Sequence, residues 1–528
     1  MEIHFANVWQ AIADEVGDRT ALIHGDERVS WRQYDDRAAR LASLFVELGL
    51  GPDSKVALYL NNGIEYVVAQ YAAFKMRGVA INVNYRYRDN ELLYLLDNSD
   101  AEVLVFHSSL GERVERIRDK APRLKAIIEV DDGGPSLDGA RRWDDELASH
   151  QPAARIGGEA SDLYMLYTGG TTGMPKGVMY PQGIFPLGVA AFGAAITGRT
   201  APTNLDELLA LGDQLDPPPV WLAACPQMHG TGMWLGTMAP LLMKGTVVTL
   251  TNRTFDPHEV WTAVERHGVS AVVIVGDAFA KPMLRALDEK AYAVPSLKAI
   301  VSSGVMWSSE VKDGLLRHLD VKLYDALGSA EGSMGATIST RQGVGTTAQF
   351  TATPAVKVVT EDGRIVEPGS DEIGMVAAVS GSLGYYKDPE KSARTFTVID
   401  GRPHSLPGDW AKVAADGSIV LLGRGSNCIN TGGEKVFPEE IEEAVKAHPA
   451  VYDCLVVGVP DERFGERVVA VASLQPDGSA DEASIMDAAA DHIARYKLPK
   501  QVVIVDHVQR APNGKADYPW AREVAARA

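Results

Sequence analysis

The sequence is poor in cysteine. Its 528 residues include three, Cys225, Cys428 and Cys454, and none belongs to a CxxC pair. An odd number of widely spaced cysteines argues against a disulfide framework and against a structural zinc site. We therefore expect a protein of a reducing compartment, the cytoplasm.

The sequence also lacks net positive charge. It has 51 lysines and arginines against 70 aspartates and glutamates, a formal net charge of −19. Nucleic-acid binding requires a basic face, so we expect no nucleic-acid partner. Small anionic ligands remain compatible, because backbone N–H groups can bind a phosphate on an acidic protein.

Long apolar runs are absent as well. The longest uncharged run, Gly177 to Gly198, contains several glycines together with Pro181 and Pro186, which favours a buried segment over a membrane span. The first residues, MEIHFANVWQ, have neither a basic nor an apolar segment, so we expect no signal peptide. Transient membrane contact and a homodimer stay open.

Short apolar runs alternate with helical patterns through the first 300 residues. This alternation predicts an α/β fold with parallel, helix-covered sheets. The expected strands are KVALYL (55–60), EVLVF (102–106), AIIEV (126–130), TVVTL (246–250), AVVIV (271–275) and AIVSS (299–303). One helix is expected to begin after Asp256, its N-cap, and to end at Gly268.

The pattern changes after about residue 350, where Asp-Gly and Pro-Gly pairs separate short β runs, as in a small antiparallel β subdomain. A helix at 438–449, three further strands and another helix follow, enough for a compact α+β domain. We expect a large N-terminal domain (1–424), a hinge (425–427) and a small, mobile C-terminal domain (428–528). An ordinary turn at 425–427 is the alternative. The acidic segment 203–220 is interpreted as a surface insertion.

The stretch YTGGTTGMPKGVMY (167–180) combines glycines, threonines and one lysine directly after an apolar strand. Such a turn exposes backbone N–H groups and hydroxyls that suit a polyphosphate. It is not a Walker A loop, because Lys176 precedes Gly177 where that motif requires serine or threonine. The string GVGTTA (343–348) does not follow an apolar strand and is rejected as a dinucleotide site.

The glycine stretch resembles the phosphate-loop signature of the adenylate-forming superfamily, which includes acyl-CoA synthetases, peptide-synthetase adenylation domains and firefly-type luciferases. Further blocks follow in that family's order: LGSAEG (327–332), GDW (408–410), GRGSNCINTGGEKVFPEEIE (423–442) and RAPNGKADY (510–518). The resemblance spans nearly the whole chain. It is strongest to bacterial fatty-acyl and steroid-side-chain CoA ligases.

The resemblance implies a role for each matched residue. Lys515 would stabilise charge during adenylation, Glu331 would bind Mg²⁺, and Asp409 and Arg424 would contact the ribose. The loop around Gly433 would line the path of coenzyme A. The residues implied to surround the phosphates and the adenine are Thr168, Gly169, Gly170, Thr171, Thr172, Gly173 and Lys176, and Ser303, Gly304, Val305, Gly328 and Ser329.

Some positions depart from the family pattern. Gly169 replaces a usual serine, Leu327 stands where an aromatic residue often stacks on adenine, and Ala330 replaces the threonine before Glu331. At the expected hinge, Ser426 takes the place of an aspartate or lysine. These departures concern the adenine contacts and the pivot, and the reaction class does not depend on them.

The acid pocket is implied to include His229, Met233, Asp277 and Met306, among other methionines and aromatic residues. Such a lining suits a large apolar acid. Core packing would explain the same residues, and a buried histidine would explain His229.

The resemblance therefore implies an AMP-forming acyl-CoA synthetase that uses ATP, Mg²⁺ and coenzyme A on a fatty or steroid-side-chain acid. An amino-acid or aryl-acid adenylating enzyme with another acceptor is one alternative, since Asp277 would suit an ammonium group. A nucleotide-binding protein without activity is another.

Overall fold

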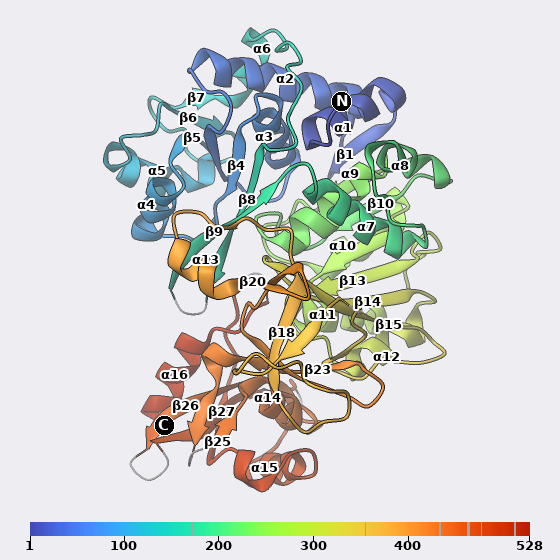
Figure 1. Ribbon diagram of the computed structural model, residues 1–528, viewed down its shortest axis with the longest axis vertical. Helices are drawn as coiled ribbons and strands as arrows, with labels where there is room; N and C mark the ends of the chain where they lie inside the picture. Colours follow the sequence, from blue (N-terminus) through green and yellow to red (C-terminus); the bar gives the residue numbers. More distant parts are fainter. Residues whose placement is uncertain (171–172, 354, 432–433, 462–464, 477, 512–513) are drawn as a thin grey trace. The chain divides into compact units, whose positions relative to one another are not determined.

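The computed structural model describes residues 1–170, 173–353, 355–431, 434–461, 465–476, 478–511 and 514–528 (Figure 1). Two compact units account for the chain. The first comprises Met1–Ser333, Ile338–Gly345 and Val379–Ser405, and the second comprises Met334–Thr337, Thr346–Ala378 and Leu406–Ala528. Residues 406–424 thus pack with the C-terminal residues, and the expected domain boundary at residue 424 stays a prediction.

The first unit contains a parallel five-stranded sheet of order β4-β3-β5-β6-β7. Its strands are β3 (Lys55–Tyr59), β4 (Val79–Asn82), β5 (Ala101–His107), β6 (Ala126–Val130) and β7 (Arg141–Arg142). All five residues of β3 are buried. Continuous burial is what the uninterrupted apolar pattern of this strand predicts for a helix-covered parallel strand.

A second series of strands in this unit has the order β2-β1-β11-β10-β12-β13-β14. All neighbours are parallel except β1 and β2. The strands are β1 (Thr20–His24), β2 (Glu27–Ser30), β10 (Val220–Ala223), β11 (Thr246–Thr249), β12 (Ala271–Ile274), β13 (Ala299–Ser303) and β14 (Lys322–Ser329), and β15 (Gly332–Ser339) follows β14. All six strands expected from the apolar runs are therefore confirmed.

The glycine stretch forms the end of an antiparallel hairpin (Figure 1). Its strands are β8 (Leu163–Gly170) and β9 (Gly173–Pro181), and β19 (Gly384–Tyr385) pairs with β9 on the other side. A second hairpin joins β20 (Phe396–Ile399) to β21 (Arg402–Ser405).

The helices of the first unit surround these strands. They are α1 (Phe5–Val16), α2 (Trp31–Glu47), α3 (Ile64–Lys75), α4 (Asp89–Asn98), α5 (Gly111–Ile117), α6 (Trp143–Ser149), α7 (Phe185–Thr197), α8 (Leu205–Ala210), α9 (Ala239–Leu242), α10 (Pro257–His267), α11 (Gly276–Glu289), α12 (Ser309–His318) and α13 (Pro389–Thr395). Helix α10 has the predicted ends. The Asp256 side chain accepts hydrogen bonds from the first turn, and Gly268 ends the helix at a φ of 64°.

The second unit begins with short antiparallel strands, as expected for the β subdomain. They are β16 (Gln349–Phe350), β17 (Lys357–Val359), β18 (Gly374–Val379), β22 (Asp409–Val413) and β23 (Ile419–Arg424). A separate sheet follows, made of β24 (Ile429–Thr431), β25 (Glu434–Val436), β26 (Val451–Asp461), β27 (Gly465–Leu474) and β28 (Gln501–Val505).

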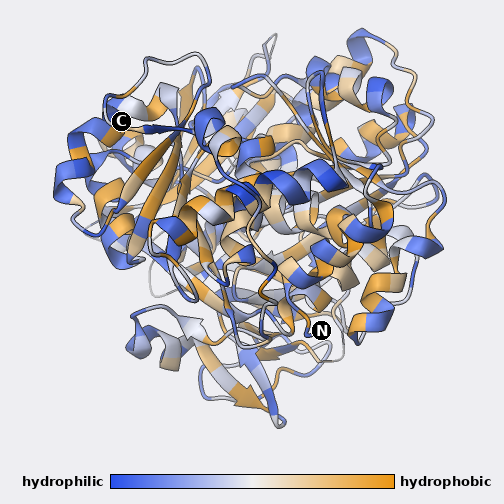
Figure 2. Cartoon of the chain, turned by 90° about the horizontal axis from the view of Figure 1, so that it is seen from above, coloured by the Kyte–Doolittle hydropathy of each residue, from blue (hydrophilic) through white to orange (hydrophobic). Residues whose placement is uncertain are grey.

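Helices α14 (Pro438–Lys446), α15 (Glu482–Ala490) and α16 (Tyr518–Arg527) pack on this C-terminal sheet, with a hydrophobic cluster on each of its faces. Figure 2 shows long strands in hydrophobic colours, while the helices carry hydrophobic and hydrophilic residues along their length. That distribution is typical of amphipathic helices that cover a sheet.

The interpretation of 203–220 as a surface insertion is wrong in part. Leu208 and Leu211 of this segment are buried in the main hydrophobic cluster, at 0% and 1% exposure. Residues three apart face the same side of a helix, so these two leucines anchor α8 while the acidic residues face solvent. The high charge of the segment concealed its apolar face.

Candidate active site

The glycine hairpin brings Thr168 opposite Lys176 and Gly170 opposite Gly173. Thr171 and Thr172 lie outside the described residues. Asn82, at the carboxyl end of β4, fixes the hairpin: its Nδ2 donates to the carbonyl oxygens of Tyr167 (2.8 Å) and Met228 (2.7 Å). One half-buried amide thereby ties the expected phosphate loop to the segment expected to bind the acid. No sequence motif indicated this long-range link.

Lys176 lies in a cluster of charged and aromatic side chains. Its Nζ is 3.2 Å from Oδ2 of Asp388 and 5.8 Å from the centre of the Tyr385 ring. Asp388 is the N-cap of α13, where its Oδ1 accepts a hydrogen bond from the backbone N–H of Lys391. That bond and the Lys176 ammonium lower the pKa of Asp388, so the carboxylate stays ionised beside the lysine.

Glu331 is buried next to the same tyrosine. Its exposure is 8%, and its Oε1 accepts a hydrogen bond of 2.7 Å from the Tyr385 hydroxyl. The Glu331 backbone is also held, since its carbonyl oxygen accepts bonds from Ser380 (2.5 Å) and Ser405 (3.2 Å). Lys176 and Glu331 were predicted from separate motifs. In the structure both lie next to Tyr385, Lys176 near its ring and Glu331 bonded to its hydroxyl.

The segments expected to contact adenine lie at the ends of two neighbouring strands. β13 ends at Ser303 and β14 at Ser329, and the two strands run parallel with Ser303 opposite Ala326. Gly304, at a φ of 94°, and Val305 follow β13 directly, and Gly328 is the penultimate residue of β14. The carboxyl ends of parallel strands are where open α/β sheets bind ligands.

Asp409 and Arg424 meet in the second unit. They are opposite residues of β22 and β23, and Nε of Arg424 is 3.1 Å from Oδ1 of Asp409. Asp409 is only 8% exposed, whereas the Arg424 side chain is 37% exposed. The pair presents a fixed carboxylate acceptor beside guanidinium donors, which suits the hydroxyl groups of a sugar.

The turn that carries Lys515 is anchored at its base. Arg510 donates two bonds to the Asp453 carboxylate (2.6 and 2.7 Å) and one to the carbonyl of Gly514 (3.1 Å). Lys515 itself is exposed. An exposed lysine next to the anchored Gly514 is compatible with the implied role, which needs an ammonium group near the ligand. Gly433 lies outside the described residues.

The residues expected to line the acid pocket fall into two groups. Met233, on the π-helix Thr231–Met238, is 1% exposed and belongs to the main hydrophobic cluster. His229 and Met306 are half-buried. π-helical turns are frequent at functional sites, so this helix agrees with a ligand site without establishing one.

Asp277, near the first turn of α11, already has partners. Its Oδ1 accepts bonds from the backbone N–H (2.9 Å) and the hydroxyl (3.1 Å) of Ser308, and Lys281 Nζ is 3.8 Å from its Oδ2. Oδ2 is buried and accepts no hydrogen bond from the described residues, but the Lys281 ammonium already lies near it, which opposes the approach of a second ammonium group. This weakens the amino-acid alternative.

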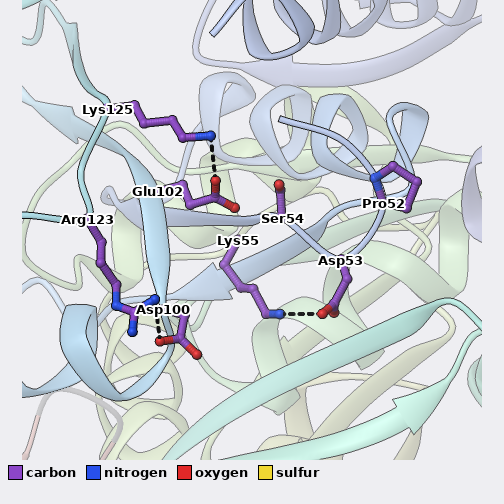
Figure 3. Close-up of a pocket in the computed structure, with 8 residues that line it drawn as sticks. All are labelled: Pro52, Asp53, Ser54, Lys55, Asp100, Glu102, Arg123 and Lys125. Carbon is purple, nitrogen blue, oxygen red and sulfur yellow. Dashed lines mark ion pairs between the residues drawn. The ribbon is translucent and has the colours of Figure 1, made fainter. Parts of the chain in front are cut away.

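A hollow of about 460 Å³ lies elsewhere in the first unit and is lined by charged residues (Figure 3). Its charges pair among themselves: Lys55 with Asp53, Arg123 with Asp100, and Lys125 with Glu102. Internal pairing satisfies these groups without a ligand.

Two observations bear on metals and membranes. Among the described residues, no group of three or more His, Cys, Asp or Glu side chains could hold a metal ion by itself. In the part of the chain that the structure describes, no helix combines the length and apolar character needed to cross a bilayer.

Comparison with known families identifies the class. Residues 9–383 match the AMP-binding enzyme family, and residues 440–515 match the AMP-binding enzyme C-terminal domain. The first match covers more than half of the chain, and the chain belongs to the AMP-binding enzyme family.

Characterised relatives match over almost their whole length. A 3-oxocholest-4-en-26-oate–CoA ligase from Rhodococcus rhodochrous is 40% identical over 99% of this chain and 96% of its own. A medium/long-chain-fatty-acid–CoA/3-oxocholest-4-en-26-oate–CoA ligase from Mycolicibacterium smegmatis is 38% identical over 99% of this chain and 97% of its own.

Among solved structures, the anthranilate CoA ligase AuaEII in complex with anthranoyl-AMP superposes with a TM-score of 0.85 at 22% identity. The match covers 100% of this chain and 98% of that one. ATP-bound MatB from Rhodopseudomonas palustris superposes with a TM-score of 0.81 at 24% identity, over 99% of each chain. These likenesses confirm the α/β fold class.

Proposed function

We propose that this chain is an AMP-forming acyl-CoA ligase that activates an apolar carboxylic acid. The observation that carries the proposal is the convergence of the glycine hairpin, Lys176 and Glu331 on Tyr385. The curated relatives named for steroid-side-chain and fatty-acid CoA ligation support the choice of reaction and of acid.

In the proposed reaction, an oxygen of the acid attacks the α-phosphorus of ATP, and pyrophosphate leaves with the electron pair of the broken P–O bond. The thiol of coenzyme A then attacks the acyl carbon, and AMP leaves. Both steps develop negative charge, so positioning and electrostatic stabilisation supply most of the catalysis.

The hairpin residues Thr168 to Gly173 would cradle the β- and γ-phosphates, and Lys176 would contribute a point charge. Ser303, Gly304, Val305, Gly328 and Ser329 would hold the adenine at the strand ends. Asp409 and Arg424 would bind the ribose, and Lys515 would contact the α-phosphate and the acid during adenylation. Gly433 would line the path of the coenzyme A thiol.

Glu331 fits a role as a Mg²⁺ ligand. Its carboxylate is fixed by Tyr385 through one oxygen, and Mg²⁺ at nucleotide sites commonly takes one or two carboxylates together with phosphate oxygens. Bound there, the ion would neutralise phosphate charge.

The proposal for the acid is a medium- or long-chain fatty acid or a steroid side-chain acid, with His229, Met233, Asp277 and Met306 near its carboxylate and chain. The methionines among these residues favour an apolar acid chain. We also propose cytoplasmic activity, and movement of residues 428–528 about 425–427 between the two steps. The family matches, which end at 383 and resume at 440, support a separate C-terminal domain.

The test is pyrophosphate release measured with Mg-ATP and a panel of acids: octanoate, palmitate, a 3-oxo-steroid side-chain acid, benzoate and alanine. The proposal predicts release that depends on a fatty or steroid acid, with a thioester formed when coenzyme A is added. Release with alanine alone would favour the amino-acid alternative. ATP binding without release for any acid would favour an inactive nucleotide-binding protein.

A further inference from the structure

Lys391, on helix α13, lies beside Lys176 although no motif pointed to it. Its Nζ is 5.5 Å from the centre of the Tyr385 ring, and Nζ of Lys176 is 5.8 Å from the same centre. Two ammonium groups thus lie near the ring of the side chain that positions Glu331.

Neighbouring like charges are unfavourable unless an anion offsets them. Burial and the Lys176 ammonium lower the pKa of Lys391, and the carboxylates of Glu331 and Asp388 oppose that effect. One oxygen of Asp388 pairs with the Lys176 ammonium, and the other accepts the backbone N–H of Lys391 at the start of α13.

Ordinary ion pairing explains the neighbouring Lys387 better than it explains Lys391. Lys387 Nζ forms an ion pair of 2.8 Å with Asp100. The same carboxylate accepts a hydrogen bond from the hydroxyl of Tyr386. Lys391 instead joins a group that already contains one lysine and is placed next to the expected phosphate loop.

We propose that Lys391 is a second cationic contact for the pyrophosphate half of ATP and acts together with Lys176. The inference rests on the proposed function and deepens it. As the bond between the α-phosphorus and the bridging oxygen breaks, the leaving pyrophosphate gains negative charge. Lys391 would bind that charge, while Asp388 holds Lys176 in place before the nucleotide arrives.

The experiment compares binding of ATP, pyrophosphate and AMP to the wild type, Lys391→Gln and Lys391→Arg by calorimetry, without acid or coenzyme A. AMP lacks the β- and γ-phosphates, so it reports on the rest of the nucleotide site. We expect Lys391→Gln to weaken ATP and pyrophosphate binding about ten-fold, to leave AMP binding unchanged, and Lys391→Arg to recover most of the loss.

Lys387→Gln is the matched control, because it removes a lysine charge four residues away that pairs with Asp100. It should bind all three ligands as the wild type does. Unchanged ATP and pyrophosphate binding in Lys391→Gln would overturn the inference, and so would an equal loss of AMP binding or a ten-fold loss in the control.

The outcomes separate this inference from the proposed function. A wild type that binds ATP and pyrophosphate through Lys391 but makes no thioester contradicts the ligase assignment and leaves the role of Lys391 standing. A wild type that binds neither ligand contradicts both.

Discussion

The hydroxyl of Tyr385 donates a hydrogen bond of 2.7 Å to Oε1 of Glu331, and both side chains are buried. The bond joins a residue of a recognisable motif to one 54 positions later that no motif marks. It fixes one carboxylate oxygen and so orients the other.

Tyr385→Phe tests this relationship. The ring near the two lysines stays, but the buried carboxylate loses a donor, which costs about 1–3 kcal/mol of stability. We expect several-fold more Mg²⁺ to be needed for half-maximal activity, measured by titrating Mg²⁺ at fixed ATP. Tyr386→Phe is the control, because its hydroxyl bonds Asp100. Equal Mg²⁺ dependence in both variants would contradict the positioning role.

Lys515→Ala separates the two half-reactions. If Lys515 stabilises charge only during adenylation, its loss should lower adenylate formation on the order of a hundred-fold or more. Thioester formation from pre-made acyl-adenylate should be largely preserved, as measured by single-turnover assays. Lys497→Ala, which removes an ion pair with Glu440, is the control. Equal losses in both half-reactions would contradict the assignment.

Asp409→Asn should weaken the binding of every ligand that contains the ribose. The carboxylate bonded to Arg424 becomes a neutral amide, and a charge-assisted acceptor for sugar hydroxyls is lost. We expect ATP and AMP affinities to fall together, about ten-fold, with pyrophosphate binding unchanged. Both variants should weaken ATP binding, but Asp409→Asn should weaken AMP binding and spare pyrophosphate binding, whereas Lys391→Gln should do the reverse for these two ligands. A loss confined to ATP would show that Asp409 does not act on the ribose.

Stability should depend on pH through a buried carboxyl group of the C-terminal sheet. Burial raises the pKa of Glu442 from 4.5 to about 8, with Arg510 opposing the shift and Tyr518 bonded beside it. At pH values between these two pKa values, the Glu442 carboxyl keeps its proton in the folded state and has lost it in the unfolded state. The free energy of unfolding should therefore fall as pH rises through this range.

Glu442→Gln provides the test, since glutamine resembles the protonated side chain and can still accept the bond from the backbone N–H of Val456. Urea unfolding between pH 5 and 9 should show a smaller loss of stability in this variant than in the wild type. Glu443→Gln, which removes an ion pair with Lys446, should keep the wild-type slope. Parallel curves for Glu442→Gln and the wild type would refute the prediction.

Local sequence signals predicted much of this fold. Asp256 and Gly268 marked the ends of α10, and uninterrupted apolar runs marked the buried strands. These features depend on neighbouring residues along the chain, which is why the sequence alone indicates them.

The site was less accessible to sequence reasoning. Motifs indicated Lys176 and Glu331, but Tyr385, Asp388 and Lys391 belong to a segment that reaches them only through tertiary folding. Asn82 was missed for the same reason, since its partners are 85 and 146 positions away. A polar residue at a strand end has no periodic signature, and only the pairing of distant strands gives it a role.

The most direct test of the acyl-adenylate route follows one oxygen atom from the acid into AMP. The enzyme is incubated with Mg-ATP, coenzyme A and a fatty acid whose carboxyl oxygens are oxygen-18, and the products are weighed by mass spectrometry. Attack of the acid on the α-phosphorus predicts AMP that carries one labelled oxygen, together with the acyl-CoA thioester. Unlabelled AMP, or label found in pyrophosphate or inorganic phosphate, would contradict the acyl-adenylate route.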